Sequence, residues 1–233
     1  MTQLILKLKI DTTKLEKYLF DEIGAILQKI SNNTFNRLPV LTDKIKDLTR
    51  EIYEDGAMIT GLLSDSSSRS NLSLRGHFGI PDGEQYEVAE SILDIITDNL
   101  YVDFSGYTLV GRKLSGRLTI LLSPNVYQDL MNADFAKIIT DKGELLHWIE
   151  WTFKAGDNPI IADYRIYATT NRKTSRSGLA IMVKANSAIW KVPSEVSGTA
   201  DDNWLTRELK KYRDRYLNLV QTALQKEFNR VLK

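Results

Sequence analysis

Alternating and helical patterns of apolar residues predict how the chain begins. Every second residue from Leu4 to Ile10 is leucine or isoleucine, the pattern of a strand with one buried face. Apolar residues then recur at steps of three and four over Leu15–Ile30 and again over Leu41–Ile52, which predicts two helices. Pro39 lies between them, and because proline lacks a backbone N–H it is expected to end or kink the first helix. The chain is therefore predicted to open with a strand and a long helix pair.

Four stretches further along the chain have the composition of strands. Tyr101–Val110 and Arg117–Ser123 are separated by a turn predicted at Gly111–Gly116. Ile160–Thr169 and Leu179–Lys184 flank a polar loop. All four are rich in the β-branched and aromatic residues that strands favour. Together with the N-terminal strand they make about five predicted strands.

The last part of the chain is predicted to form one long helix, Trp204–Leu232. Its apolar positions follow steps of four and three, and Leu209, Tyr216 and Leu219 belong to this nearly heptad stripe. A helix with one apolar face has to bury that face. The stripe is therefore expected to dock on the helix's own domain or on a neighbouring subunit, and these three residues are candidate partner-binding residues.

The predicted elements are clustered along the chain rather than strictly alternating, which favours an α+β fold. We expect a mixed or antiparallel sheet of about five strands with packed helices, a long N-terminal helix pair and a long C-terminal helix. No repeat or long linker divides the 233 residues, so a single domain is predicted. Residues 1–63 would form the strand and helix pair, residues 64–203 the sheet-containing core, and residues 204–233 the C-terminal helix.

The net charge of +1 conceals an uneven distribution of charged residues. Residues 1–163 contain 17 Lys and Arg against 24 Asp and Glu, whereas residues 164–233 contain 14 against 6. Such a chain can present opposite charge on two surfaces, which suits head-to-tail packing or a polyanionic partner. Ordinary solvated surfaces would produce the same counts.

A window without acidic residues extends from Asp163 to Glu195. Its bases include Arg172, Lys173 and Arg176, which lie in the polar loop between two predicted strands. Because no nearby acid can pair with them, we expect these three residues to contact an acidic neighbour or DNA. A solvated, mobile loop is the alternative.

The sequence offers little from which an enzymatic site could be built. It has no cysteine, and its two histidines, His77 and His147, are 70 residues apart, which disfavours thiolate and histidine-rich metal sites. Phosphate-loop and G-x-S-x-G motifs are absent. Asp82 with Glu208 and Lys210 superficially fits a metal-dependent nuclease, but acid-x-lysine triplets arise by chance in so charged a chain. No catalytic, cofactor-binding or metal-binding residue is assigned, and no apolar run is long enough to span a membrane.

Several motifs become informative when their order is considered. They are LRGHFGIPD at 74–82, the tryptophan helix at 145–156 followed by Ile160-Ile161, SRSGLAIMV at 175–183, WKVP at 190–193 and GTADDNWLTR at 198–207. The combination resembles virion structural proteins of tailed bacteriophages, in particular those of the neck and tail-completion region. The resemblance implies a protein without enzymatic activity that helps to form a ring joining the head connector to the tail.

Two functions stay open on the sequence alone. The first is a structural protein of the virion, assembled in the host cytoplasm, whose partners are further copies of itself, other connector and tail proteins, and DNA passing through a lumen. Opposite charges on successive subunit faces would suit such a homo-oligomeric ring. The second is a nucleic-acid-binding accessory protein that uses the basic C-terminal third, where bases and aromatic residues interleave. Neither function requires a cofactor or a membrane.

Overall fold

The computed structural model describes residues 3–11, 20–68, 71–110, 113–139, 143–156, 158–169 and 175–231. The chain divides into two compact units and passes between them four times. Unit 1 consists of Met1–Thr49, Asn99–Ser123 and Tyr212–Lys233, and unit 2 of Arg50–Asp98 and Pro124–Lys211. Residues 1–233 are predicted to form a single domain, and the division into compact units does not test that prediction.

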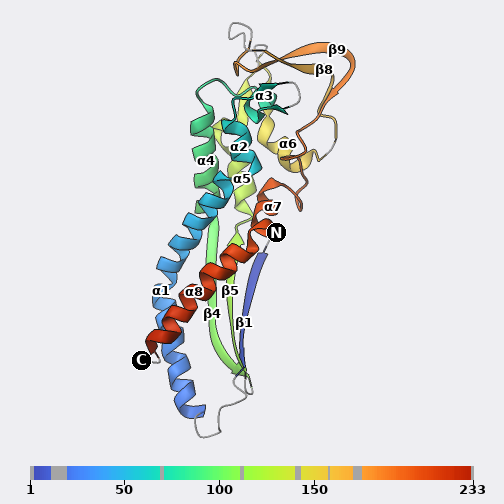
Figure 1. Cartoon of the computed structure of the whole chain (residues 1–233). Coiled ribbons are helices and arrows are strands. Elements are labelled where there is room, and N and C mark those ends of the chain that lie inside the picture. Colours follow the sequence, from blue (N-terminus) through green and yellow to red (C-terminus); the bar gives the residue numbers. More distant parts are fainter. Residues whose placement is uncertain are drawn as a thin grey trace. The chain divides into compact units, whose positions relative to one another are not determined.

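Unit 1 contains a three-stranded antiparallel sheet in the order β1-β5-β4 (Figure 1). The strands are β1 (Gln3–Asp11), β4 (Leu100–Val110) and β5 (Lys113–Leu122). Every second residue of β5 from Leu118 to Leu122 is a buried apolar side chain, and Thr119 between them is buried as well. The predicted N-terminal strand and the predicted hairpin are both confirmed.

Strand β5 begins earlier than predicted, at Lys113. Gly116 lies within the strand, opposite Tyr107. A Cβ atom at Gly116 would lie 2.7 Å from the ring of Tyr107, so this glycine allows the aromatic ring to lie across the strand.

One continuous helix, α1 (Phe20–Glu54), replaces the predicted N-terminal helix pair. The expected break at Pro39 is therefore wrong. Buried residues follow helical spacing on both sides of the proline: Ile30, Thr34, Leu41, Ile45, Thr49 and Ile52. Pro39 itself is exposed, so the carbonyl that loses its N–H donor lies on the solvent side of the helix, where water can satisfy it.

Two helices replace the predicted long C-terminal helix. They are α7 (Trp204–Lys211), in unit 2, and α8 (Arg213–Val231), in unit 1. The interruption at Tyr212 follows Lys210 and Lys211, which occupy the last turn of α7, where positive charge is favourable. An unbroken apolar stripe in the sequence cannot reveal this boundary.

Both helices of unit 1 are joined to its sheet and to each other by polar and aromatic contacts. The backbone N–H of Tyr107 donates to Ser31 Oγ of α1 at 3.0 Å. The ring of Tyr107 also packs edge-on against Phe228 of α8. The hydroxyl oxygens of Thr49 and Tyr216 lie 3.0 Å apart, and burial raises the pKa of Tyr216 to about 12.

Unit 2 is mainly helical. It contains α2 (Ala57–Leu63), α3 (Leu74–Phe78), α4 (Gln85–Asp98), α5 (Asn125–Asn132), η2 (Asp134–Ala136), α6 (Trp148–Lys154) and α7, with the end of α1. Its strands form three two-stranded pairs: β2 (Ser67–Ser68) with β3 (Asn71–Leu72), β6 (Lys137–Ile139) with β7 (Leu145–His147), and β8 (Ile161–Ala168) with β9 (Ala180–Trp190).

The α+β class is thus confirmed, whereas the single sheet of about five strands is wrong. Across the described residues, strands that are close in sequence pair as hairpins, and only β1 adds a third strand to one of them. The tryptophan helix expected at 145–156 is also shorter, because β7 occupies its first part. No described helix is both long enough and apolar enough to cross a membrane.

Candidate interaction surface

Unit 2 brings the separated motifs of the sequence into contact with one another. The backbone N–H of Asp82, in the first motif, donates to the carbonyl of Arg176, in the SRSGLAIMV motif, at 3.4 Å. The carbonyl of Gly198, in the last motif, accepts from the N–H of Gly156 at the end of the tryptophan helix. The motifs are therefore parts of one structure, which we call the motif cluster (residues 74–82, 145–156, 175–183, 190–193 and 198–207).

Arg75 fixes the turn at the centre of the first motif. Its side chain is 3% exposed and pairs with the carboxylates of Asp65, at 2.7 Å, and Asp82. Ser73 caps α3 by accepting from the N–H of Gly76, and Gly79 ends the helix in the left-handed region at φ +71°, which glycine adopts without strain. A buried guanidinium with two carboxylate partners holds this segment in one conformation.

An aromatic group anchors one end of the β8–β9 hairpin on the motif cluster. Trp190, the last residue of β9, packs edge-on against Trp151 and Phe78, with ring centroids 5.6 and 6.3 Å apart. Its indole N–H donates to Nδ1 of His77 at 3.3 Å. That hydrogen bond requires an unprotonated Nδ1 on the imidazole. Burial lowers the pKa of His77 below its ordinary value of 6.5, although the carboxylate of Glu195 acts in the opposite direction.

Acidification is expected to destabilise the fold through His77. Because the folded pKa is lowered, the unfolded chain binds the proton more readily. The stabilisation is present above pH 6.5 and is lost as the pH falls through the lowered pKa. Urea unfolding between neutral and mildly acidic pH should show this loss, and His77→Gln, which keeps an acceptor for Trp190, should flatten the curve. An unchanged pH dependence in His77→Gln would contradict the assignment.

The other end of the hairpin is also held by the motif cluster. Ser175 is buried, and its hydroxyl donates to the carbonyl of Ala180 at 2.6 Å and accepts from the Ala180 N–H. Next to it, Leu179 lies against Gly76 of α3, where an added Cβ would be 3.4 Å from the Leu179 Cβ. The hairpin is therefore fixed to α3 near both of its ends.

Between these two attachments β8 and β9 form an arch (Figure 1). The antiparallel register shifts between the pairs Ala162↔Ile189 and Tyr164↔Lys184, leaving additional β9 residues opposite Asp163. Asp163 has a φ of 59°, which lies in the left-handed region that residues other than glycine seldom adopt. Its carboxylate accepts a hydrogen bond from the N–H of Ser187 at 3.1 Å. The irregularity bends the ribbon, as bulges do.

The arch exposes apolar and basic side chains together. Its large exposed apolar residues are Tyr167, Met182, Val183 and Ile189, with exposed fractions of 40–64%. Arg165 and Lys184 are exposed beside them. Strands β8 and β9 pair with each other in a separate two-stranded sheet, and these side chains are accessible on it. We call the exposed part of residues 161–168 and 180–190 the arch surface.

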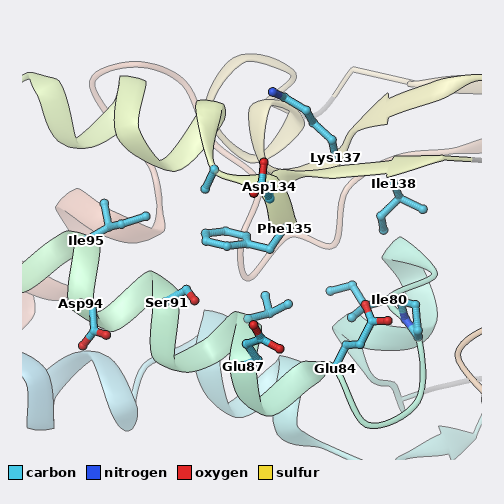
Figure 2. A pocket seen from close by; sticks show the side chains of 13 residues that line it. Ile80, Glu84, Glu87, Ser91, Asp94, Ile95, Asp134, Phe135, Lys137 and Ile138 are labelled. Atoms are coloured by element: carbon cyan, nitrogen blue, oxygen red, sulfur yellow. The ribbon is translucent and has the colours of Figure 1, made fainter.

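A groove of about 600 Å³ lies along α4 on the same unit (Figure 2). Its apolar lining includes Ile80, Val88, Ile95, Phe135 and Ile138. Its acidic lining consists of Glu84, Glu87, Asp94 and Asp134, against one base, Lys137. We call this hollow the α4 groove.

Three of the four carboxylates in the α4 groove have no described ion-pair or hydrogen-bond partner for their side chains. Asp94 is the exception, because Arg50 binds it at 2.7 Å, and Figure 2 shows its side chain turned away from Phe135. Glu84, Glu87 and Asp134 are exposed. The groove thus combines an apolar floor with a rim on which carboxylates outnumber the one base, Lys137.

The predicted partner-binding residues do not form one surface. Leu209 is buried in unit 2, and Tyr216 is completely buried in unit 1, so both are already covered within the chain. Leu219 is half-buried in α8. Their role in binding a partner stays a prediction.

The predicted basic loop is described only at its end. Arg172 and Lys173 lie outside the described residues. Arg176 is exposed, beside the attached end of the arch. Sequence reasoning missed the arch surface itself, although apolar residues at successive positions, as in Ile181–Val183, are a signal for a strand with two apolar faces.

The superficial nuclease pattern has structural explanations in the described residues. The carboxylate of Asp82 pairs with the guanidinium of Arg75. Oε2 of Glu208 lies 3.7 Å from Nζ of Lys211. No group of three or more His, Cys, Asp or Glu residues suited to a metal ion occurs in the described part of the chain.

The last motif starts α7 with reciprocal capping bonds. The N–H of Thr206 donates to Oδ1 of Asn203, and the N–H of Asn203 donates to the Thr206 hydroxyl, each at 3.1 Å. Asp202 pairs instead with Arg207 at 3.0 Å. The indole N–H of Trp204 donates to Thr152 of α6 at 3.1 Å, which joins this helix start to the tryptophan helix.

Comparison with known proteins identifies no relative. No family model matches the chain, and no curated protein or solved structure is significantly similar to it.

Proposed function

We propose that this chain is a non-enzymatic structural protein of a tailed bacteriophage particle and forms part of a homo-oligomeric ring at the neck or tail-completion region. The observation that carries the proposal is the arch surface, where accessible apolar side chains gather with bases. Met182 and Val183 follow each other in β9, so both faces of the ribbon carry an exposed apolar side chain. Exposed apolar surface bordered by polar residues marks a site of protein–protein contact. Bases at its edge add orientation and specificity to such a contact.

The attachment of the arch supports a role in assembly. Trp190 holds one end on His77, and Ser175 with Leu179 holds the other. A contact element that is already ordered loses little conformational entropy when it binds. The arch is therefore suited to repeated, identical contacts between subunits.

The position in the phage particle rests on the resemblance of the ordered motifs. The structure adds that these motifs touch one another and carry both ends of the arch. A shared structural task explains why motifs without catalytic residues occur together. Under this proposal the protein is assembled in the host cytoplasm and is found in the virion between the head connector and the tail.

A nucleic-acid-binding accessory protein is the second candidate. Arg165, Arg176 and Lys184 are exposed on and beside the arch, and such bases can neutralise phosphates. DNA within the lumen of a ring would use the same residues, so the two functions differ in whether the chain assembles.

Assembly of the purified chain tests the proposal. Sedimentation velocity and electron microscopy should show a closed oligomer. The double variant Met182→Ser/Ile189→Ser should lose assembly while keeping the unfolding midpoint, because both side chains are exposed. The matched control is Val40→Ser/Tyr101→Ser, which removes exposed apolar groups outside the arch and should assemble normally. A monomer that binds duplex DNA in a salt-dependent manner would instead favour the second candidate.

A further inference from the structure

The α4 groove requires an occupant that is both apolar and basic. Its floor is formed by side chains such as Val88 and Phe135, and its rim carries the three carboxylates without described partners, Glu84, Glu87 and Asp134. The negative rim would repel an anionic ligand. A cation without apolar groups would leave the apolar side chains of the floor in contact with water. Apolar side chains flanked by bases would cover the apolar floor and pair with the carboxylates of the rim.

The arch surface has this complementary chemistry. Val183 is 40% exposed on one face of the ribbon with Arg165 opposite it, and Met182, also 40% exposed, shares the other face with Lys184. Residues 164–194 contain six bases and no acid. The arch and the groove therefore match in apolar character and are opposite in charge.

The arch cannot be the occupant of the groove in its own chain as the structure stands. None of the residues that line the groove belongs to β8 or β9. Both ends of the arch are fixed to α3, through His77 and through Gly76. The matching arch must then come from a second copy.

We propose that the arch surface of one copy docks in the α4 groove of the next copy. Because the two surfaces are different parts of the same unit, the contact is head-to-tail, and repetition of it closes a ring when the rotation between copies permits closure. This inference rests on the proposed ring function and names the two surfaces that form the subunit contact. The groove accepts side chains from the arch rather than the whole ribbon.

Charge exchange between the two surfaces tests the contact. The arch variant is Arg165→Glu/Lys184→Glu, and the groove variant is Glu84→Lys/Glu87→Lys; all four side chains are exposed, so folding should be retained. Each variant alone should associate at least about tenfold more weakly than the wild type. An equimolar mixture of the two should regain assembly, because each reversed surface then meets a reversed partner.

Controls with the same change in charge separate a specific contact from net charge. Lys44→Glu/Lys226→Glu and Asp43→Lys/Asp103→Lys reverse exposed residues of unit 1 and should assemble as the wild type does. Raising the salt concentration should weaken wild-type assembly, because part of the attraction is between exposed charges.

Disulfide formation provides an independent readout, since the chain contains no cysteine. A mixture of Val183→Cys, on the arch, with Ser91→Cys, in the groove, should give cross-linked dimers on mild oxidation. Replacing Val183→Cys by Val40→Cys, also exposed but outside the arch, should give none.

The outcomes distinguish this inference from the proposed function. A wild-type ring that is unaffected by both charge variants and gives no cross-link would overturn the arch-to-groove contact and leave the ring function standing. A wild-type chain that stays monomeric would overturn the ring function and this contact together. Loss in each variant, recovery in their mixture and a specific cross-link would support both.

Discussion

Leu209→Asp is expected to unfold unit 2 or to lower the free energy of unfolding by about 4 kcal/mol or more. Leu209 is 5% exposed on α7, so the carboxylate would be removed from water. The loss should appear in the isolated chain, because the residue is already buried there. Denaturant unfolding followed by circular dichroism measures it.

Leu219→Asp is the matched control from the same predicted apolar stripe. Leu219 is half-buried on α8, so its substituted carboxylate can reach water, and a loss of about 1 kcal/mol is expected. Equal stability of the two variants would show that burial within the chain does not distinguish these positions.

Trp190→Ala is expected to lower the free energy of unfolding by about 3–5 kcal/mol. The substitution leaves a cavity beside Phe78 and Trp151 and removes the hydrogen bond to His77. Because this contact anchors one end of the arch, trypsin should also cleave faster after Arg165 and Lys184 than it does in the wild type.

Trp190→Phe separates the anchoring of the arch from global stability. Phenylalanine keeps most of the aromatic contact with Trp151 and should lose less than half as much stability as Trp190→Ala, with slow cleavage of the arch. Unchanged proteolysis of Trp190→Ala would mean that the arch is held without its tryptophan.

Local patterns in the sequence were sufficient for much of the secondary structure. The alternation in Leu4–Ile10 predicted β1 because a strand places every second side chain on one face. The apolar stripe predicted a helix that starts at Trp204, and α7 starts there, capped by Asn203. These features depend on neighbours within a few residues, which the sequence displays directly.

Such local patterns could not predict that α1 continues across Pro39. A proline weakens a helix locally by about 3 kcal/mol, and only burial of residues on both sides, such as Leu41 and Ile45, can offset that cost. The interruption at Tyr212 has the same character, because one apolar stripe continues through it while the chain changes unit.

The sequence by itself determined the α+β class, the hairpin of β4 and β5, and the charge asymmetry of this protein. Only the tertiary structure decided that β8 and β9 stay a separate pair and that Met182 and Ile189 are exposed. It also decided that an acidic, apolar-floored groove forms along α4. The physical reason is that propensity and charge are properties of residues near one another in the chain, whereas exposure depends on which distant segments pack against them.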